Sequence, residues 1–230
     1  METCMSKKAI DYSEHMDSDN LQSQQIEERL RELILTAQLA PDSNMTQAGL
    51  IKMLGCGRTP LREALHRLNV TKEVAMVPNK GIYIPQIDVM QLTDAMETLY
   101  LIYPLAMELA AVRASEEQLG ALKAALDTYN GSSEPVGSRG LLDFAFHKLA
   151  AEACGNEYLA QAITRACYSV VRFGYALRVK NRTFAQAAEV AYEHTELYEA
   201  LRARDGKSAR ETSQRHFAPN RVSIIAAIQN

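Results

Sequence analysis

The sequence predicts a mostly α-helical protein with a small N-terminal domain and a larger all-α bundle. Apolar residues recur at helical spacing along most of the chain. Two short strand-like segments, 74–77 and 82–84, interrupt this pattern, and helical periodicity resumes after Asp88. We therefore expect a disordered tail over 1–20, a domain of three helices and a small β-hairpin over 21–87, and a six- or seven-helix bundle over 88–230.

Two helices are expected before the strand-like segments. The first has one apolar face, and Leu39 and Pro41 are expected to end it. The second follows after a short connection. The apolar positions are Ile26, Leu30, Leu33 and Ile34 in the first helix, and Met45, Leu50 and Leu54 in the second.

The third helix has the form of a helix that enters the major groove of DNA. Gly55, Cys56 and Gly57 predict a turn, and Pro60 stands in the first helical turn, where a missing N–H costs little. The apolar stripe of this helix is Leu61, Ala64, Leu65 and Leu68. Its N-terminal end exposes Arg58, Thr59 and Arg62, and arginine in such a position can bond guanine or clamp a phosphate.

From Leu21 to Ile84 these elements resemble, in order, the winged helix-turn-helix domain of GntR-type transcription regulators. The resemblance implies that 74–84 form the wing hairpin, that Lys80 at its tip reaches a phosphate or the minor groove, and that Gly81 has a positive φ. The chain departs from the family pattern at a few positions. Asp42 stands where the family often has Gly, and Thr71-Lys72-Glu73 replaces the usual Glu-Gly-Leu.

Composition and charge fit a cytoplasmic DNA-binding protein. The net charge is −3, but residues 21–87 carry 8 basic and 6 acidic groups, so the positive excess is local to the proposed DNA-binding domain. The sequence contains no run of about 18 apolar residues, so we expect no membrane span. The first 20 residues lack the apolar core of a signal peptide, and the four cysteines show no paired spacing, as expected of reduced thiols.

The bundle should consist of helices separated by clear breakers. Pro104 is expected to kink the first of these helices or to end its first half. Breakers stand at 130–135, 155–156 and 205–206. The expected helices cover 90–114, 116–130, 140–154, 157–180, 184–204 and 207–228.

Four residues of the bundle offer ligands for a metal. Asp143 and His147 are four apart on one helix and so share a face, while His194 and His216 lie on two later helices. One carboxylate and three imidazoles suit zinc, nickel, manganese or iron. From spacing alone the signal is weak, since a helical histidine is more often a surface or core residue.

The bundle also resembles the ligand-binding FCD domain of FadR-like GntR regulators. The matching segments are Phe144–Leu149 with the turn after it, His194 with the helix around it, and Arg215-His216. The resemblance implies a divalent metal, zinc or nickel first, held by Asp143, His147, His194 and His216. It also implies a small-molecule effector, such as a carboxylate, beside that metal.

The effector contacts are less clear from the sequence. Many relatives carry an Arg, then Glu four residues on, in the first bundle helix, where this chain has Leu99 and Tyr103. Arg165 and Arg172 are candidate substitutes for that Arg, although a basic residue on a bundle helix is usually a solvated one.

The sequence thus favours a metabolite-responsive transcription regulator, with a repressor as the expected type. It would bind double-stranded DNA as a homodimer on an inverted-repeat operator. One alternative is a metalloenzyme that uses the Asp/His site, which is disfavoured because no general base or nucleophile stands near the ligands in a recognisable motif. Another is a regulator whose metal is purely structural.

Overall fold

The computed structural model describes residues 12–78, 81–86, 89–133, 139–179 and 187–228. The chain divides into two compact units. The smaller unit takes in residues up to 34 and 39–85, and the larger takes in 35–38 and 86 onward. Each unit has its own buried apolar core.

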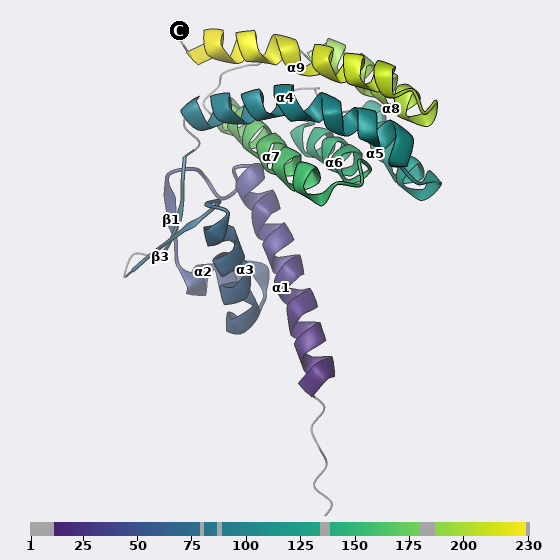
Figure 1. Cartoon of the computed structure of the whole chain (residues 1–230). Helices are drawn as coiled ribbons and strands as arrows, with labels where there is room; N and C mark the ends of the chain where they lie inside the picture. The colour runs from purple at the N-terminus through teal and green to yellow at the C-terminus, as the bar shows by residue number, and fades with distance from the viewer. Residues whose placement is uncertain (1–11, 79–80, 87–88, 134–138, 180–186, 229–230) are drawn as a thin grey trace, which may run out of the picture. The chain divides into compact units, whose positions relative to one another are not determined.

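Three helices form the body of the smaller unit: α1 (Tyr12–Leu35), α2 (Gln47–Leu54) and α3 (Arg58–Val70) (Figure 1). The side chain of Thr46 caps α2 by accepting from the Gly49 N–H, and Gly55 ends this helix in the left-handed conformation, with φ +63°. The apolar faces that the sequence predicts meet in one core, which includes Leu30, Leu50 and Leu65. The turn at 55–57 thereby sets α3 against α1 and α2.

A three-stranded antiparallel sheet completes this unit. Its strands are β1 (Ser43–Met45), β2 (Ala75–Val77) and β3 (Gly81–Ile84), in the order β1-β3-β2. β3 lies in the centre, with Met45 opposite Ile82 on one side and Val77 opposite Gly81 on the other. Strands β2 and β3 are the predicted hairpin, while β1 is an addition to it.

Three boundaries in this unit differ from the prediction. α1 begins at Tyr12, so residues 12–20, which we assigned to a disordered tail, are helical, and residues 1–11 lie outside the described part of the chain. α1 also ends at Leu35, before Leu39 and Pro41, because Ala37 adopts φ +56°. Met45 belongs to β1 and not to the second helix, because Thr46 caps that helix.

Two residues in family glycine positions adopt left-handed backbone conformations. Asp42 has φ +62° and Lys72 has φ +61°, a region that costs a non-glycine residue about 1 kcal/mol or more. The Asp42 carboxylate accepts a hydrogen bond from the Tyr83 hydroxyl at 2.9 Å. The backbone N–H of Asp42 donates to the Ile84 carbonyl. Both residues therefore adopt, without glycine, a conformation that glycine takes more easily.

The larger unit is all-α in its described residues and consists of six helices, which confirms the predicted fold class. They are α4 (Val89–Arg113), α5 (Glu116–Gly131), α6 (Gly140–Glu152), α7 (Glu157–Val179), α8 (Ala187–Arg202) and α9 (Gly206–Ile228). α4 runs alongside α7 and α9, and α6 packs between α5 and α7 (Figure 1). The segment 180–186, where we expected the fifth helix to begin, lies outside the described residues.

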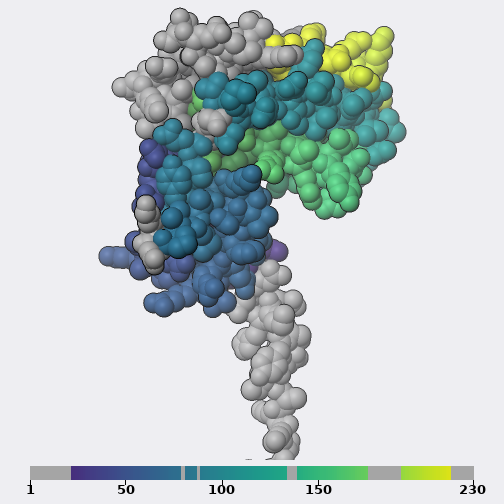
Figure 2. Space-filling view, turned by 60° about the vertical axis from the view of Figure 1, so that its left-hand side comes forward, coloured from purple at the N-terminus to yellow at the C-terminus, as the bar shows by residue number. Residues whose placement is uncertain are grey.

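Pro104 does not end the first half of α4, because the helix runs continuously from Val89 to Arg113. Pro104 is buried, and packing of α4 against α7 and α9 offsets the hydrogen bond that proline removes. By length and composition α4 could cross a membrane, but half of its apolar window is buried inside the bundle, as in a core helix. Part of α4 lies at the bundle surface, seen as teal atoms in Figure 2.

Candidate metal centre and DNA-binding helix

The N-terminal end of α3 presents polar side chains to solvent. Arg58, Thr59 and Arg62 are all exposed, while Pro60 and Leu61 are buried beneath them. Gly57 is the N-cap and makes no side-chain hydrogen bond to the helix, so the first N–H groups of α3 remain available to a phosphate. The end of α3 therefore has both the donors and the exposure that a recognition helix requires.

The wing tip is described in part. Gly81 has φ +92°, the positive value that we predicted. A Cβ at this position would lie 2.5 Å from the Met45 carbonyl oxygen, so Gly81 also permits the close approach of β1. Lys80 lies outside the described residues.

Arg67, on the same helix, serves the interior of the small unit instead. Its guanidinium binds the buried Glu27 carboxylate and donates to the Ser23 hydroxyl at 3.1 Å, both on α1. Arg31 bridges Glu27, at 2.9 Å, and Glu73, at 3.0 Å. This network holds α3 and the segment before β2 against α1.

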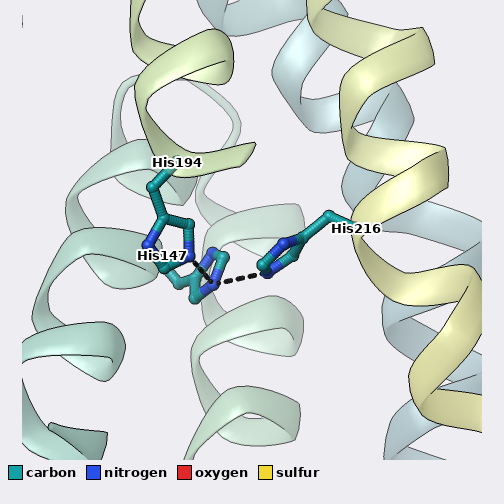
Figure 3. Close-up of side chains that lie close together, drawn as sticks. All are labelled: His147, His194 and His216. Atoms are coloured by element: carbon teal, nitrogen blue, oxygen red, sulfur yellow. Dashed lines mark hydrogen bonds between the residues drawn. The ribbon is translucent and has the colours of Figure 1, made fainter. Parts of the chain in front are cut away.

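Three buried imidazoles converge in the bundle, one each from α6, α8 and α9 (Figure 3). His147, His194 and His216 are 2%, 1% and 6% exposed. The Nε2 atom of His147 lies 3.1 Å from Nε2 of His194 and 3.1 Å from Nε2 of His216. Ligand atoms of all three lie within 4.8 Å of one another.

These separations suit a first-row metal. Bonds of about 2.1 Å from nitrogen to zinc place two nitrogens about 3.0 Å apart at an octahedral angle and about 3.4 Å apart at a tetrahedral one. Asp143 completes the set, because its Oδ1 lies 3.4 Å from Nε2 of His194 and 3.7 Å from Nε2 of His147. The four predicted ligands therefore lie together at the spacing of a coordination shell.

Hydrogen bonds to the other two rings cannot both satisfy Nε2 of His147. A ring nitrogen has either one proton or one in-plane lone pair, so Nε2 of His147 can make one good hydrogen bond but faces two other nitrogens. A cation between the rings would use all three lone pairs at once. The donor set thus fits a divalent metal better than it fits a hydrogen-bonded core.

Burial tunes the protonation of these groups in favour of metal binding. It lowers the pKa of His147 and of His194 well below the ordinary value, so both rings are neutral at pH 7. Although 27% of the Asp143 side chain stays exposed, burial raises its pKa to about 6, against the opposing effect of His216. At pH 7 the carboxylate is therefore mostly ionised and able to coordinate.

Other side chains surround the rings. The Tyr103 hydroxyl lies 2.8 Å from Nδ1 of His147, and a Glu193 carboxylate oxygen lies 2.8 Å from Nδ1 of His216. Edge-to-face contacts with Tyr103, Tyr129 and Phe217 line the rest of the cluster. The residues of the site thus lie in an environment that is mainly aromatic.

Sequence reasoning did not find every member of this site. Glu193 was missed, because its partner His216 lies 23 residues away on another helix. Tyr103 had been noted only as a departure from the family, and its neighbouring position, Leu99, is a fully buried core residue. Of the two arginine candidates, Arg165 is exposed and Arg172 is buried at 4% exposure, so only Arg172 is in the bundle interior.

Comparison with known proteins covers both units. Residues 22–84 match the gntR family of bacterial regulatory proteins, and residues 94–219 match the FCD domain. Over 195 residues the chain is 24% identical to the HTH-type transcriptional repressor GlaR of Escherichia coli K12, with 82% of this chain and 89% of GlaR covered. It is 23% identical to the HTH-type regulator YdhC of Bacillus subtilis 168, over 82% of this chain and 84% of YdhC.

Solved structures show the same fold. The structure of E. coli McbR/YncC superposes with a TM-score of 0.73 at 20% identity, covering 91% of this chain and 99% of that one. A GntR regulator from Rhodococcus sp. RHA1 gives a TM-score of 0.67 at 18% identity, covering 89% and 98%. Family matches to both units and this shared architecture make the chain a GntR-family transcriptional regulator with a C-terminal FCD domain.

Proposed function

We propose that this regulator is a repressor whose affinity for its operator is set by a small carboxylate bound at a metal in the bundle. The observation that carries the proposal is the convergence of three buried imidazoles and Asp143 from three different helices. The relative GlaR is named a repressor, which supports this direction of regulation. We place the protein in the cytoplasm, where its DNA is.

On DNA, the protein would act as a homodimer on an inverted repeat. Two copies of α3 related by a twofold axis would present Arg58, Thr59 and Arg62 to equivalent half-sites. Lys80 and Gly81 at the wing would contact the backbone or the minor groove beside each half-site. A modest positive excess in this unit implies affinity that falls steeply as salt rises.

The metal would be zinc or nickel, held by Asp143, His147, His194 and His216. Three neutral imidazoles and one carboxylate leave a divalent ion with net positive charge and with room for further oxygen ligands. A carboxylate effector would balance that charge and fill the open coordination positions. Buried Arg172 is a candidate for a second contact with the effector. Tyr103 links His147 to α4, and α4 begins at Val89, shortly after β3 ends at Ile84. Repacking at the metal can therefore reach the DNA-binding unit through α4.

Replacing Arg58 or Arg62 by alanine should weaken operator binding by about 1–3 kcal/mol, roughly 5- to 150-fold. Both side chains are exposed at the start of α3, so the fold should be unchanged. Fluorescence anisotropy with DNA from upstream of the protein's own gene measures the loss. Arg29→Ala, an exposed arginine of α1, is the matched control. If both variants bind the operator as tightly as the control does, α3 is not the helix that recognises the operator.

Metal affinity should fall as the pH drops through about 6. In the metal-free protein Asp143 has a raised pKa of about 6, so below that pH a proton competes with the metal for the carboxylate. Burial lowers the pKa of His147 and of His194, so their protons compete with the metal only at a lower pH than those of an ordinary histidine. Titration of the metal-free protein with zinc at pH 7.0, 6.0 and 5.0 tests this. Asp143→Asn should bind more weakly at pH 7 but with a flatter pH profile, and parallel profiles would contradict the assignment.

A further inference from the structure

Two hydrogen bonds hold histidine rings of the cluster on the side away from the other rings, a buried one at His147 and a partly buried one at His216. On His147 and His216 the Nε2 atom faces the other rings, while Nδ1 points toward a partner outside the cluster. The partner of His147 is the Tyr103 hydroxyl of α4, at 2.8 Å, and the partner of His216 is the Glu193 carboxylate of α8, at 2.8 Å. In the described residues Nδ1 of His194 is buried and has no such partner.

These partners influence which ring nitrogen of each histidine, Nδ1 or Nε2, carries the proton. A carboxylate only accepts hydrogen bonds, so Glu193 requires the proton of His216 on Nδ1 and leaves the Nε2 lone pair directed at the cluster. A phenol can donate or accept, so Tyr103 permits the same arrangement at His147 by accepting from Nδ1–H. Burial raises the pKa of Tyr103 well above its ordinary value, which keeps the phenol neutral.

We infer that Tyr103 and Glu193 are positioning residues that fix the ring orientation of His147 and His216, and that Glu193 also fixes the proton of His216 on Nδ1, so that both Nε2 lone pairs can meet at the metal. This inference rests on the metal site of the proposed function. Tyr103 gives His147 a neutral partner, whereas Glu193 gives His216 a charged one.

Partners of this kind raise ligand basicity and remove the cost of selecting one ring orientation, and their loss typically lowers metal affinity about 10- to 100-fold. We expect this range for Tyr103→Phe and for Glu193→Ala. Glu193→Gln keeps an acceptor oxygen and should recover part of the affinity that Glu193→Ala loses. The effect should lie in metal binding, because the rings remain packed among Phe146, Phe217 and Tyr129.

The experiment compares the full-length variants by competition of Zn²⁺ or Ni²⁺ against a chromophoric chelator. Tyr129→Phe is the matched control, because Tyr129 is also buried and its ring packs edge to face against His194, with the ring centroids 5.0 Å apart. Unlike Tyr103, Tyr129 has no described hydrogen bond to a ring nitrogen. Nitrogen NMR of histidine-labelled, zinc-loaded protein supplies a second readout. In the wild type Nδ1 of His147 and of His216 should be protonated, and the His147 signal should change in Tyr103→Phe.

The outcomes separate this inference from the proposed function. If the wild type takes up neither ion, the metal site is absent and the inference fails with it. If the wild type binds metal while Tyr103→Phe and Glu193→Ala bind as tightly as Tyr129→Phe, the metal site stands and the inference alone is overturned. Weakened binding in both variants, near-normal binding in the control and partial recovery in Glu193→Gln support it.

Discussion

His194→Ala should reduce the metal content of the purified protein from about one ion per chain to nearly none. His194 is 1% exposed, and its Nε2 lies 3.4 Å from Oδ1 of Asp143 and 3.1 Å from Nε2 of His147, so its loss removes a central ligand. Elemental analysis measures this directly. His66→Ala is the control, because His66 lies exposed on α3, outside the cluster.

The same substitution should remove the thermal stabilisation that metal provides. An ion present at about 1,000 times its Kd stabilises the folded state by about 4 kcal/mol, which corresponds to roughly 8–16 °C in a chain of this size. Wild type and His66→Ala should show that shift on addition of zinc or nickel, and His194→Ala should not. A wild type that contains no metal and gains no stability would refute the site.

Effector control should disappear with the metal. A stabilising carboxylate, found by thermal-shift screening, should also change the operator affinity of the wild type. In the His194→Ala, His216→Ala double variant both effects should vanish together, because both depend on the same ion. An effector that still alters DNA binding in the double variant would exclude coupling through the metal, even if the protein remained a repressor.

Gly81→Ala should destabilise the small unit by about 3 kcal/mol or more, since a positive φ alone costs a non-glycine residue about 1–2 kcal/mol. To this is added a clash, because the new Cβ would lie 2.5 Å from the Met45 carbonyl oxygen. That contact is to backbone in the paired strand β1, so no rotamer relieves it. The wing should detach from β1, and operator affinity should fall as well.

Urea denaturation, with amide hydrogen exchange to localise the change to β1 and β3, tests this expectation. Gly120→Ala is the matched control, because Gly120 lies within α5 and its Cβ would meet open space. There the same substitution should stabilise by about 1 kcal/mol through helix propensity. Opposite signs at the two glycines would establish that the backbone of the wing requires glycine at 81. Wild-type stability of Gly81→Ala would contradict the close β1–β3 approach.

Local sequence signals were sufficient to predict the positions of most of the helices. Breakers such as Gly55 and Asp205 mark their ends, and the described helices of the bundle follow the expected order. β1 could not be foreseen, because Ser-Asn-Met has little strand character and becomes a strand only by pairing with β3. The end of α1 was also misplaced, since Ala37 gives no sequence sign of its positive φ.

The candidate metal ligands could be named from the sequence because the family resemblance identified them, and Asp143 and His147 also share a helix face by spacing. Their hydrogen-bond partners could not, because Glu193 and Tyr103 meet the histidines only when α8, α4 and α9 pack together. Arg67 illustrates the same limit. From its position on α3 it resembles a DNA contact, and only the fold reveals Glu27 and Ser23 beneath it.

The contacts between Arg67 and α1 also restrict how the DNA specificity of this protein could be transferred to a related regulator. A graft of 58–70 alone into a relative would carry Arg67 away from Glu27 and Ser23, which belong to α1. In the recipient the Arg67 guanidinium would lose both of these acceptors, and with them the contacts that hold α3 against α1. Conversely, a foreign helix placed here would leave Glu27 buried at 9% exposure beside Arg31 alone. Chimeras that exchange DNA specificity should therefore move positions 23, 27 and 58–70 as one set.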